Sequence, residues 1–214
     1  MGIRRGGGRT ALVIVDGLDG AGKDTVAGIL ATLLAARDRT VAVRSHPSGN
    51  VFGRMAKAFL LSRGLLARAA ATFFFGLDAL TSTAFLGYLR RRNDVVIFVR
   101  YLLSAAYLPR SMSRPIHDWF ASFLPDADVK LYVSTRPDVA MARIEERDES
   151  REMFETPDAF ERVRHRVAAL MDESWTVIDN NGSFRAIREQ LEPVLLRITS
   201  GGGPGRRASG GGSA

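Results

Sequence analysis

Short apolar runs alternate with longer segments of helical periodicity along this chain of 214 residues. The runs are rich in Val, Ile and Leu and nearly free of charge, as in strands that are buried on both faces of a parallel sheet. Such runs predict five strands, at residues 11–15, 40–44, 95–99, 129–135 and 175–179.

The segments between these runs carry apolar residues at helical spacing. They predict helices at residues 25–37, 52–61, 65–92, 137–147, 158–173 and 184–198. Gly76 and Gly87 are the points at which we expect the long third helix to break, if it breaks. Strands that alternate with helices, without a repeat or an internal linker, predict an α/β protein with three layers. Its core would be a five-stranded parallel sheet with helices on both faces.

The composition changes sharply at both ends of the chain. Residues 1–10 and 201–214 together hold 11 of the 21 glycines and no acidic residue. Such segments cannot bury enough surface to offset the entropy of ordering them, so we predict disordered tails and a single domain over residues 11–200. The tails carry five of the seven excess positive charges. The domain is therefore nearly charge-balanced, and a nucleic acid partner is not indicated.

The residue types that are missing or scattered exclude several kinds of site. The chain has no cysteine, which rules out disulfides, thiolate metal sites and thiol nucleophiles. His46, His117 and His165 lie too far apart to suggest a metal site, and we expect structural roles for them. The longest apolar stretch, residues 65–80, contains two charged residues and is short for a membrane span of about 20 residues. No signal sequence is apparent, so we expect a cytoplasmic protein without a membrane partner.

A glycine-rich segment follows the first predicted strand directly. It matches the pattern G-x-x-x-x-G-K, in which backbone N–H groups surround a β-phosphate and the lysine reaches the β- and γ-phosphates. Only three lysines occur in the chain, against 27 arginines, so a lysine at this position is unexpected by chance. The segment predicts an ATP-binding loop and a fold of the P-loop NTPase type. Its residues are Gly17, Leu18, Asp19, Gly20, Ala21, Gly22, Lys23, Asp24 and Thr25.

One position departs from this pattern. The residue after the lysine is normally Ser or Thr, whose hydroxyl binds Mg²⁺, and here it is Asp24. A carboxylate is also a good ligand for a hard cation. We expect Asp24 to be a metal ligand, with a role as a helix cap as the alternative.

From Val15 through Leu195 the sequence resembles the thymidylate kinases, a branch of the P-loop nucleoside monophosphate kinases. The strongest match is the loop itself, D-G-L-D-G-A-G-K-D-T, which is close to the form that this family uses. Weaker matches follow in the family's order. They are Pro47-Ser48-Gly49-Asn50 with Gly53 and Lys57, Phe75 ahead of Asp78, Val99-Arg100-Tyr101, Pro137-Asp138-Val139-Ala140 with Arg143 and Arg147, and Phe154-Glu155 with Phe160 and Val163.

The resemblance implies transfer of a phosphoryl group from ATP to dTMP, with Mg²⁺ as a cofactor and nucleotides as the partners. It implies that Lys57 binds the acceptor phosphate and that Phe75 stacks on the base. Arg100 and Tyr101 would complete the acceptor site. Arg100 closes a central strand, where parallel sheets bind ligands, and its planar guanidinium suits contact with two phosphates.

The same resemblance implies a short lid at about residues 147–157. Lys23 and Arg100, with Arg147 and Arg151 from the lid, would supply the positive charge that phosphoryl transfer needs. The family usually forms homodimers through helices next to the acceptor site, and the apolar region 65–85 is the corresponding surface here.

Three further departures leave other functions open. Val99 stands where the family has the aspartate of D-R-Y, and Ala79 stands where it has an arginine that contacts the base. The glutamine expected after Tyr107 is missing. The alternatives are a related kinase with another acceptor, such as a different deoxynucleotide or a nucleoside, and a nucleotide-binding module without catalysis.

Overall fold

A single parallel sheet forms the centre of the computed structural model, which describes residues 9–62, 65–123, 125–146 and 157–200. The strand order is β2-β3-β1-β4-β5. The prediction of a five-stranded parallel sheet of the P-loop type is confirmed. The strands are β1 (Ala11–Gly17), β2 (Val41–Ser45), β3 (Val95–Val99), β4 (Val129–Ser134) and β5 (Trp175–Asp179).

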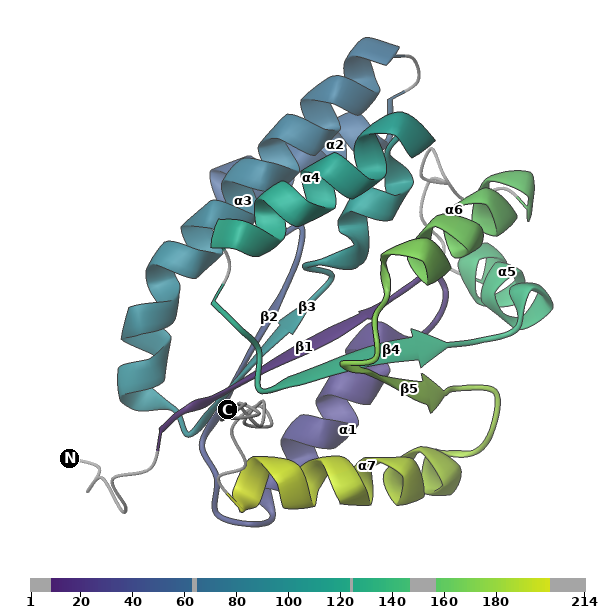
Figure 1. The fold of residues 1–214 in the computed structure, drawn as a ribbon. Coiled ribbons are helices and arrows are strands. Elements are labelled where there is room, and N and C mark those ends of the chain that lie inside the picture. The colour runs from purple at the N-terminus through teal and green to yellow at the C-terminus, as the bar shows by residue number, and fades with distance from the viewer. Residues whose placement is uncertain (1–8, 63–64, 124, 147–156, 201–214) are drawn as a thin grey trace, which may run out of the picture.

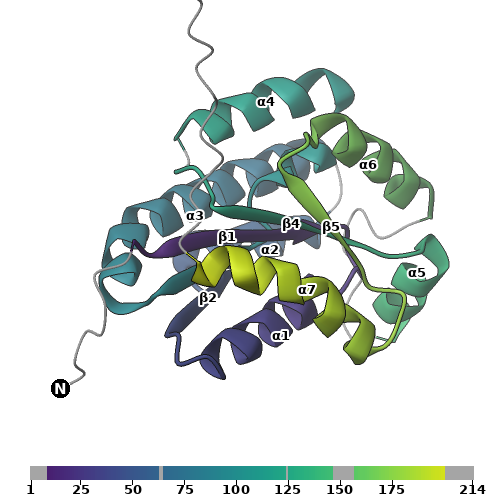
Figure 2. The ribbon, with the colours of Figure 1, turned by 60° about the horizontal axis from the view of Figure 1, so that its bottom comes forward.

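Helices cover both faces of this sheet (Figure 1, Figure 2). On one face α1 and α7 pack against the side chains of Val13, Val15 and Ile97. On the other face α3, α4 and α6 enclose a second core around Ile14 and Phe98. The helices are α1 (Lys23–Ala35), α2 (Val51–Leu60), α3 (Leu65–Arg92), α4 (Arg110–Phe123), α5 (Pro137–Glu145), α6 (Pro157–Leu170) and α7 (Phe184–Thr199).

The long helix α3 runs unbroken through both of its glycines. Gly76 lies where α4 crosses closely, since a Cβ there would come within 3.0 Å of Phe120 Cζ. The stretch Ala70–Arg92 is long and apolar enough to span a membrane by length and composition. In this fold α3 packs against α2 and the sheet, and it carries the fully buried carboxylate of Asp78, which accepts hydrogen bonds from Ser48.

Two elements between β3 and β4 are absent from the sequence prediction. One is a five-residue 3₁₀ turn, η1 (Leu103–Tyr107), and the other is α4. The α4 sequence contains Pro115 and several residues with weak helix propensity, so its local signal is poor. It forms because Ile116 and Phe120 pack against the second core.

Strand β1 lies at the centre of the sheet. The chain passes first to β2 and β3 on one side of β1 and then to β4 and β5 on the other side. The carboxyl ends of the strands lie along one edge, because Val15 pairs with Val99 and Val99 with Ser45. Ligands bind in the crevice outside this edge, where the strand order reverses. The predicted tails, except for Arg9 and Thr10, lie outside the described residues. So does the predicted lid at about 147–157, except for Pro157, which begins α6.

Candidate active site

The loop between β1 and α1 has a backbone conformation that only glycine adopts easily. Gly20 and Gly22 have φ values of 73° and 82°. A side chain at Gly20 would also collide with the backbone of Ala140, at 2.4 Å, and one at Gly22 with Asn180 Nδ2, at 2.3 Å. The glycines therefore allow both the turn of the loop and the close packing of α5 and the β5–α7 connection around it.

Three carbonyl groups of this loop accept hydrogen bonds from side chains, one from within the loop and two from other elements. Lys23 Nζ donates to Leu18 O at 2.5 Å, and Asn180 Nδ2 donates to Ala21 O at 2.7 Å. Arg143 Nη1 donates to Gly20 O at 3.4 Å. Helix α1 begins here without a side-chain cap, so its first N–H groups have no side-chain acceptor at the loop. A loop with these N–H groups at a helix N-terminus is suited to bind phosphate.

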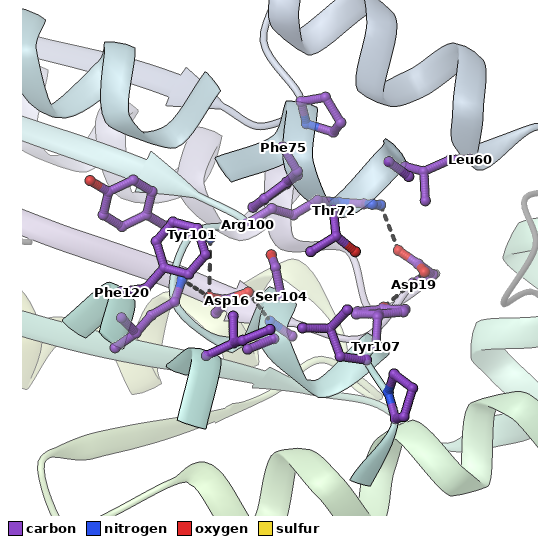
Figure 3. Close-up of a pocket in the computed structure, with 18 residues that line it drawn as sticks. Asp16, Asp19, Leu60, Thr72, Phe75, Arg100, Tyr101, Ser104, Tyr107 and Phe120 are labelled. Carbon is purple, nitrogen blue, oxygen red and sulfur yellow. Dashed lines mark hydrogen bonds and ion pairs between the residues drawn. The ribbon is translucent and has the colours of Figure 1, made fainter. Parts of the chain in front are cut away.

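A buried carboxylate, Asp19, joins the loop to β3 and η1 (Figure 3). Its Oδ1 lies 2.7 Å from Arg100 Nη2 and 3.8 Å from Lys23 Nζ. Its Oδ2 accepts a hydrogen bond of 2.8 Å from the hydroxyl of Tyr107. One negative charge thus holds the two cations that the sequence assigns to phosphate binding at the same point.

Lys23 is almost fully buried, with 3% of its surface exposed. Burial and, to a smaller extent, the nearby charge of Arg100 together lower the pKa of Lys23 to about 8, although Asp19, Asp16 and Asp24 act in the opposite direction. A triphosphate would add negative charge beside the amine and so favour its protonated form.

Arg100 adopts a left-handed backbone conformation, with φ of 58°. This region is unfavourable for a long side chain, and such residues are found mainly where a site requires a particular direction. The backbone N–H of Arg100 donates to Val15 O at 3.1 Å, which ties the residue to β1. The conformation directs the guanidinium toward Asp19 (Figure 3).

A mostly apolar pocket opens beside this charge cluster (Figure 3). Phe75 and Thr72 of α3 face Ser104 and Tyr107 of η1 across it. Its polar side chains are few, as in sites that bind the flat, partly apolar bases of nucleotides. The lining residues are Asp16, Gly17, Asp19, Pro47, Leu60, Ala71, Thr72, Phe75, Arg100, Tyr101, Leu102, Ser104, Ala105, Tyr107, Leu108, Pro109, Ile116 and Phe120.

The segment before α2 is held by buried polar groups. Ser48 donates to Asp78 from its backbone N–H, at 2.7 Å, and from its hydroxyl, at 2.5 Å. Gly53 of α2 lies against the backbone of Ser48, where a Cβ would come within 2.0 Å of Ser48 O. Asn50 caps the helix by accepting the N–H of Gly53 at 2.7 Å. The segment is therefore placed precisely at the rim of the pocket.

His46 precedes this segment and has a structural environment. Its Nδ1 lies 3.2 Å from Val99 O and its Nε2 lies 2.7 Å from the hydroxyl of Ser82. Burial lowers the pKa of His46, although the charge of Asp78 opposes the shift. A neutral ring that donates from Nδ1 and accepts at Nε2 satisfies both contacts.

Asp24 is exposed at the start of α1 and does not lie in the pocket. Its Oδ1 accepts a hydrogen bond of 2.7 Å from the hydroxyl of Ser45, at the carboxyl end of β2. A carboxylate and a hydroxyl, both hard oxygen ligands, thus lie side by side next to the phosphate loop.

The structure brings together most of the residues assigned from the sequence. Lys23 and Arg100 meet at Asp19, while Phe75 and Tyr101 line the pocket. The hydroxyl of Tyr101 points away from it and bonds to Thr83, and burial raises the pKa of Tyr101 to about 12. Lys57 is exposed on α2 and does not line the pocket. Arg147 and Arg151 lie outside the described residues.

Several polar residues of the site are missing from the sequence prediction. Asp16 accepts backbone N–H groups of the η1 segment, and Asn180 holds the phosphate loop. Thr72 and Ser104 place hydroxyl groups in the pocket lining. Of these residues, only Asp16 could have been found from the sequence, because a charged residue at the end of a buried apolar strand is unusual. The others depend on contacts between distant elements.

The protein has a glycine-rich phosphate loop at the edge of a parallel sheet that helices cover on both faces. An arginine lines the adjacent pocket, and a buried lysine lies beside the same carboxylate as that arginine. These features define a P-loop nucleotide-binding protein. Comparison with known proteins narrows this class. The family profile described as thymidylate kinase matches residues 15–191. This chain belongs to the thymidylate kinase family and is therefore a phosphotransferase by family.

Individual relatives agree over most of the chain. The thymidylate kinase of Xanthomonas euvesicatoria pv. vesicatoria (strain 85-10) is 28% identical over an alignment of 192 residues that covers 86% of this chain and 83% of the relative. The probable thymidylate kinase of Archaeoglobus fulgidus is 28% identical over 200 residues, covering 86% and 94%. A solved structure of the thymidylate kinase from Candida albicans matches with a TM-score of 0.72 at 20% identity, over 90% of this chain and 93% of that one.

The lowered pKa of Lys23 predicts a pH dependence of ATP binding. Only the protonated amine attracts the phosphates, so affinity should be nearly constant below about pH 7 and fall as the pH rises through about 8. Between about pH 7 and about pH 9 we expect a loss of about tenfold, measured by calorimetry. The Lys23→Met variant should bind more weakly and without this slope. An equal slope in that variant would assign the titration to another group.

Proposed function

We propose that this protein transfers the γ-phosphoryl group of ATP to dTMP. The observation that carries the proposal is the meeting of Lys23 and Arg100 at Asp19, between the phosphate loop and the pocket. Phosphoryl transfer depends mainly on positioning and on neutralising charge, and two cations between a donor site and an acceptor site supply both.

The phosphates of ATP would lie in the loop of residues 17–25. The backbone N–H groups and Lys23 would hold the β- and γ-phosphates. The adenosine would extend toward the hollow lined by Thr25, Arg143, Asn180 and Phe184 beside the loop. A phosphate oxygen of the acceptor then attacks the γ-phosphorus while the bond to the β,γ-bridging oxygen breaks.

The acceptor would occupy the pocket, with its base against Phe75 and its phosphate toward Arg100. A guanidinium presents five N–H donors, so Arg100 can contact a phosphate while Nη2 remains on Asp19. Lys57, exposed on the neighbouring helix α2, is a candidate for the acceptor phosphate only if α2 or its side chain moves toward the pocket. Arg147 and Arg151 remain the proposed lid residues.

One observation favours a different acceptor as the second candidate. Ala79 is buried, and within the described part of the chain Arg100 contributes the one guanidinium of the pocket lining. Among the described lining residues there is no side-chain amide. The lining does contain the hydroxyl groups of Thr72 and Ser104, which the edge of a base stacked on Phe75 would meet. These hydroxyls both donate and accept, so they discriminate less sharply between bases than an arginine does.

A panel of acceptors assayed with ATP and Mg²⁺ tests the function. We expect turnover with dTMP above that with other nucleoside monophosphates, and loss of at least about 100-fold in the Lys23→Ala variant, since a cation is removed from the transferring phosphate. Strong turnover of another nucleotide, with none of dTMP, would establish the second candidate. Tight ATP binding with no turnover of any acceptor would leave a nucleotide-binding module.

Mg²⁺ would be held at Asp24, with Ser45 beside it. The two residues fit the ion, since a carboxylate and a hydroxyl lie 2.7 Å apart next to the loop. P-loop enzymes commonly hold Mg²⁺ with a hydroxyl on the loop and a carboxylate at the end of a strand. Here the two kinds of ligand are exchanged, with the carboxylate of Asp24 on the loop and the hydroxyl of Ser45 at the end of β2. The described residues contain no cluster of three or more His, Asp or Glu side chains, so ATP would supply the other ligands. The ion would neutralise phosphate charge.

Binding of Mn²⁺, followed by electron paramagnetic resonance in the presence of a non-hydrolysable ATP analogue, tests this site. We expect Asp24→Asn to weaken Mn²⁺ by about tenfold and Ser45→Ala by less, because one charged and one neutral ligand are removed. Asp38→Asn, the same change in the exposed turn that follows α1, is the control. Unchanged Mn²⁺ affinity in Asp24→Asn would rule out Asp24 as the metal ligand. The alternative role as a helix cap is already wrong, because Gly22 is the N-cap of α1 and no side chain caps the helix.

We also propose a cytoplasmic homodimer formed through α2 and α3. These adjacent helices expose large apolar side chains, which mark interaction surfaces on soluble proteins. They include Phe52, Met55, Leu66, Phe73, Leu80 and Phe85.

Sedimentation equilibrium tests the dimer. We expect Phe73→Arg to convert the dimer into a monomer, because a charge would be buried in an apolar interface. Leu196→Arg, an equally exposed position on α7 at the opposite face of the sheet, should remain dimeric. A monomeric wild-type chain at micromolar concentration would rule the proposal out.

A further inference from the structure

The short turn η1 carries three residues of the pocket wall, Ser104, Ala105 and Tyr107, of which Ser104 and Tyr107 are polar. A 3₁₀ turn of five residues has few hydrogen bonds of its own, and their geometry is poorer than in an α-helix. Its position therefore depends on what holds its two ends. Both ends are held by charged side chains that come from other elements.

A carboxylate holds the beginning of the turn. Asp16 Oδ2 accepts the backbone N–H groups of Tyr101, Leu102 and Leu103, at 3.1, 2.8 and 2.8 Å (Figure 3). Asp16 is 2% exposed and stands at the end of β1, directly before the phosphate loop. The three N–H groups have no partner within the turn, so this contact satisfies them and favours the negative charge at that end.

A guanidinium holds the other end. Arg166 of α6 donates from Nη1 to Leu108 O at 2.6 Å and to Ala106 O at 3.3 Å. These two carbonyl groups flank Tyr107 on both sides. The turn thus has a carboxylate at its N–H end and a cation at its carbonyl end. Both charges have the sign that the dipole of the turn favours at that end.

Between its two ends the turn directs Tyr107 toward the charge cluster. The hydroxyl of Tyr107 donates to Asp19 Oδ2 at 2.8 Å, and Asp19 in turn pairs with Arg100. A shift of the last residues of η1 would move this hydroxyl away from Asp19. It would also change the wall that the acceptor meets.

We propose that Arg166 is a positioning residue of the acceptor site, which fixes η1 so that Tyr107 and Ser104 face the acceptor. The inference rests on the proposed function for the identity of the acceptor. Arg166 does not line the pocket, so it acts through the turn.

The attachment of α6 to the domain does not depend on Arg166. Phe160, Val163, Val167 and Leu170 of the same helix are buried in the second core. Substitution of Arg166 should therefore leave α6 in place and release only the end of η1.

The Arg166→Met variant keeps much of the side-chain length and removes the charge. We expect dTMP to bind about tenfold more weakly by calorimetry, comparable to the loss of one hydrogen bond to a charged group, while ATP affinity changes less than about twofold. Arg162→Met is the matched control, because Arg162 is exposed one turn earlier on the same helix. Equal dTMP affinity in Arg166→Met and wild type would overturn the proposal.

Two further variants separate positioning from general stability. Arg166→Lys should recover part of the dTMP affinity, since one ammonium can still reach a carbonyl. In a Tyr107→Phe background, Arg166→Met should have much less effect, because its target hydroxyl is already missing. Independent effects of the two substitutions would show that Arg166 acts elsewhere.

Amide hydrogen exchange tests the turn without any acceptor. In Arg166→Met we expect faster exchange at residues 104–108 by about tenfold, and unchanged exchange at residues 12–16 of β1. Unchanged exchange at 104–108 would overturn the proposal. If the wild-type protein binds ATP but not dTMP, the proposed acceptor is wrong, and the exchange comparison still decides whether Arg166 fixes the turn.

Discussion

The buried carboxylate of Asp19 is the interaction on which the rest of the site depends. Lys23 comes from the phosphate loop and Arg100 from the end of β3, and each would be repelled by the other without a negative charge between them. Asp19 also accepts the hydroxyl of Tyr107, so three elements meet at one side chain. The cost of burying this charge is offset because its partners include two cations and a hydroxyl donor.

Two carboxylates, Asp16 in the last part of β1 and Asp19 just after it, hold different parts of the site in place. Asp19 binds Lys23 and Arg100, the two side chains proposed to face the phosphates, whereas Asp16 binds backbone N–H groups at the start of η1. The donor loop and one wall of the acceptor pocket are thus fixed to the same strand end. This arrangement explains how a loop that binds one nucleotide can be aligned with a pocket for a second nucleotide.

The departures from the thymidylate kinase pattern have local physical consequences. Asp24 finds a partner in Ser45, which lies beside Val99 in the register of β2 and β3. Ala79 is buried in the second core and contributes no charge to the pocket, whose neutral donors include Thr72 and Ser104. Phosphate-binding groups are therefore retained more completely than groups that would read the edge of a base.

The sequence by itself determined the strands, the phosphate loop and the family, because buried β-branched runs and a glycine-rich loop before a lysine are local patterns. The sequence also predicted that Lys23, Phe75 and Arg100 belong to one site. Only the tertiary structure revealed η1 and α4, whose sequences have weak local preference and form through packing. It alone placed Lys57 outside the pocket and joined Arg166 to Tyr107, since such contacts depend on how distant elements meet.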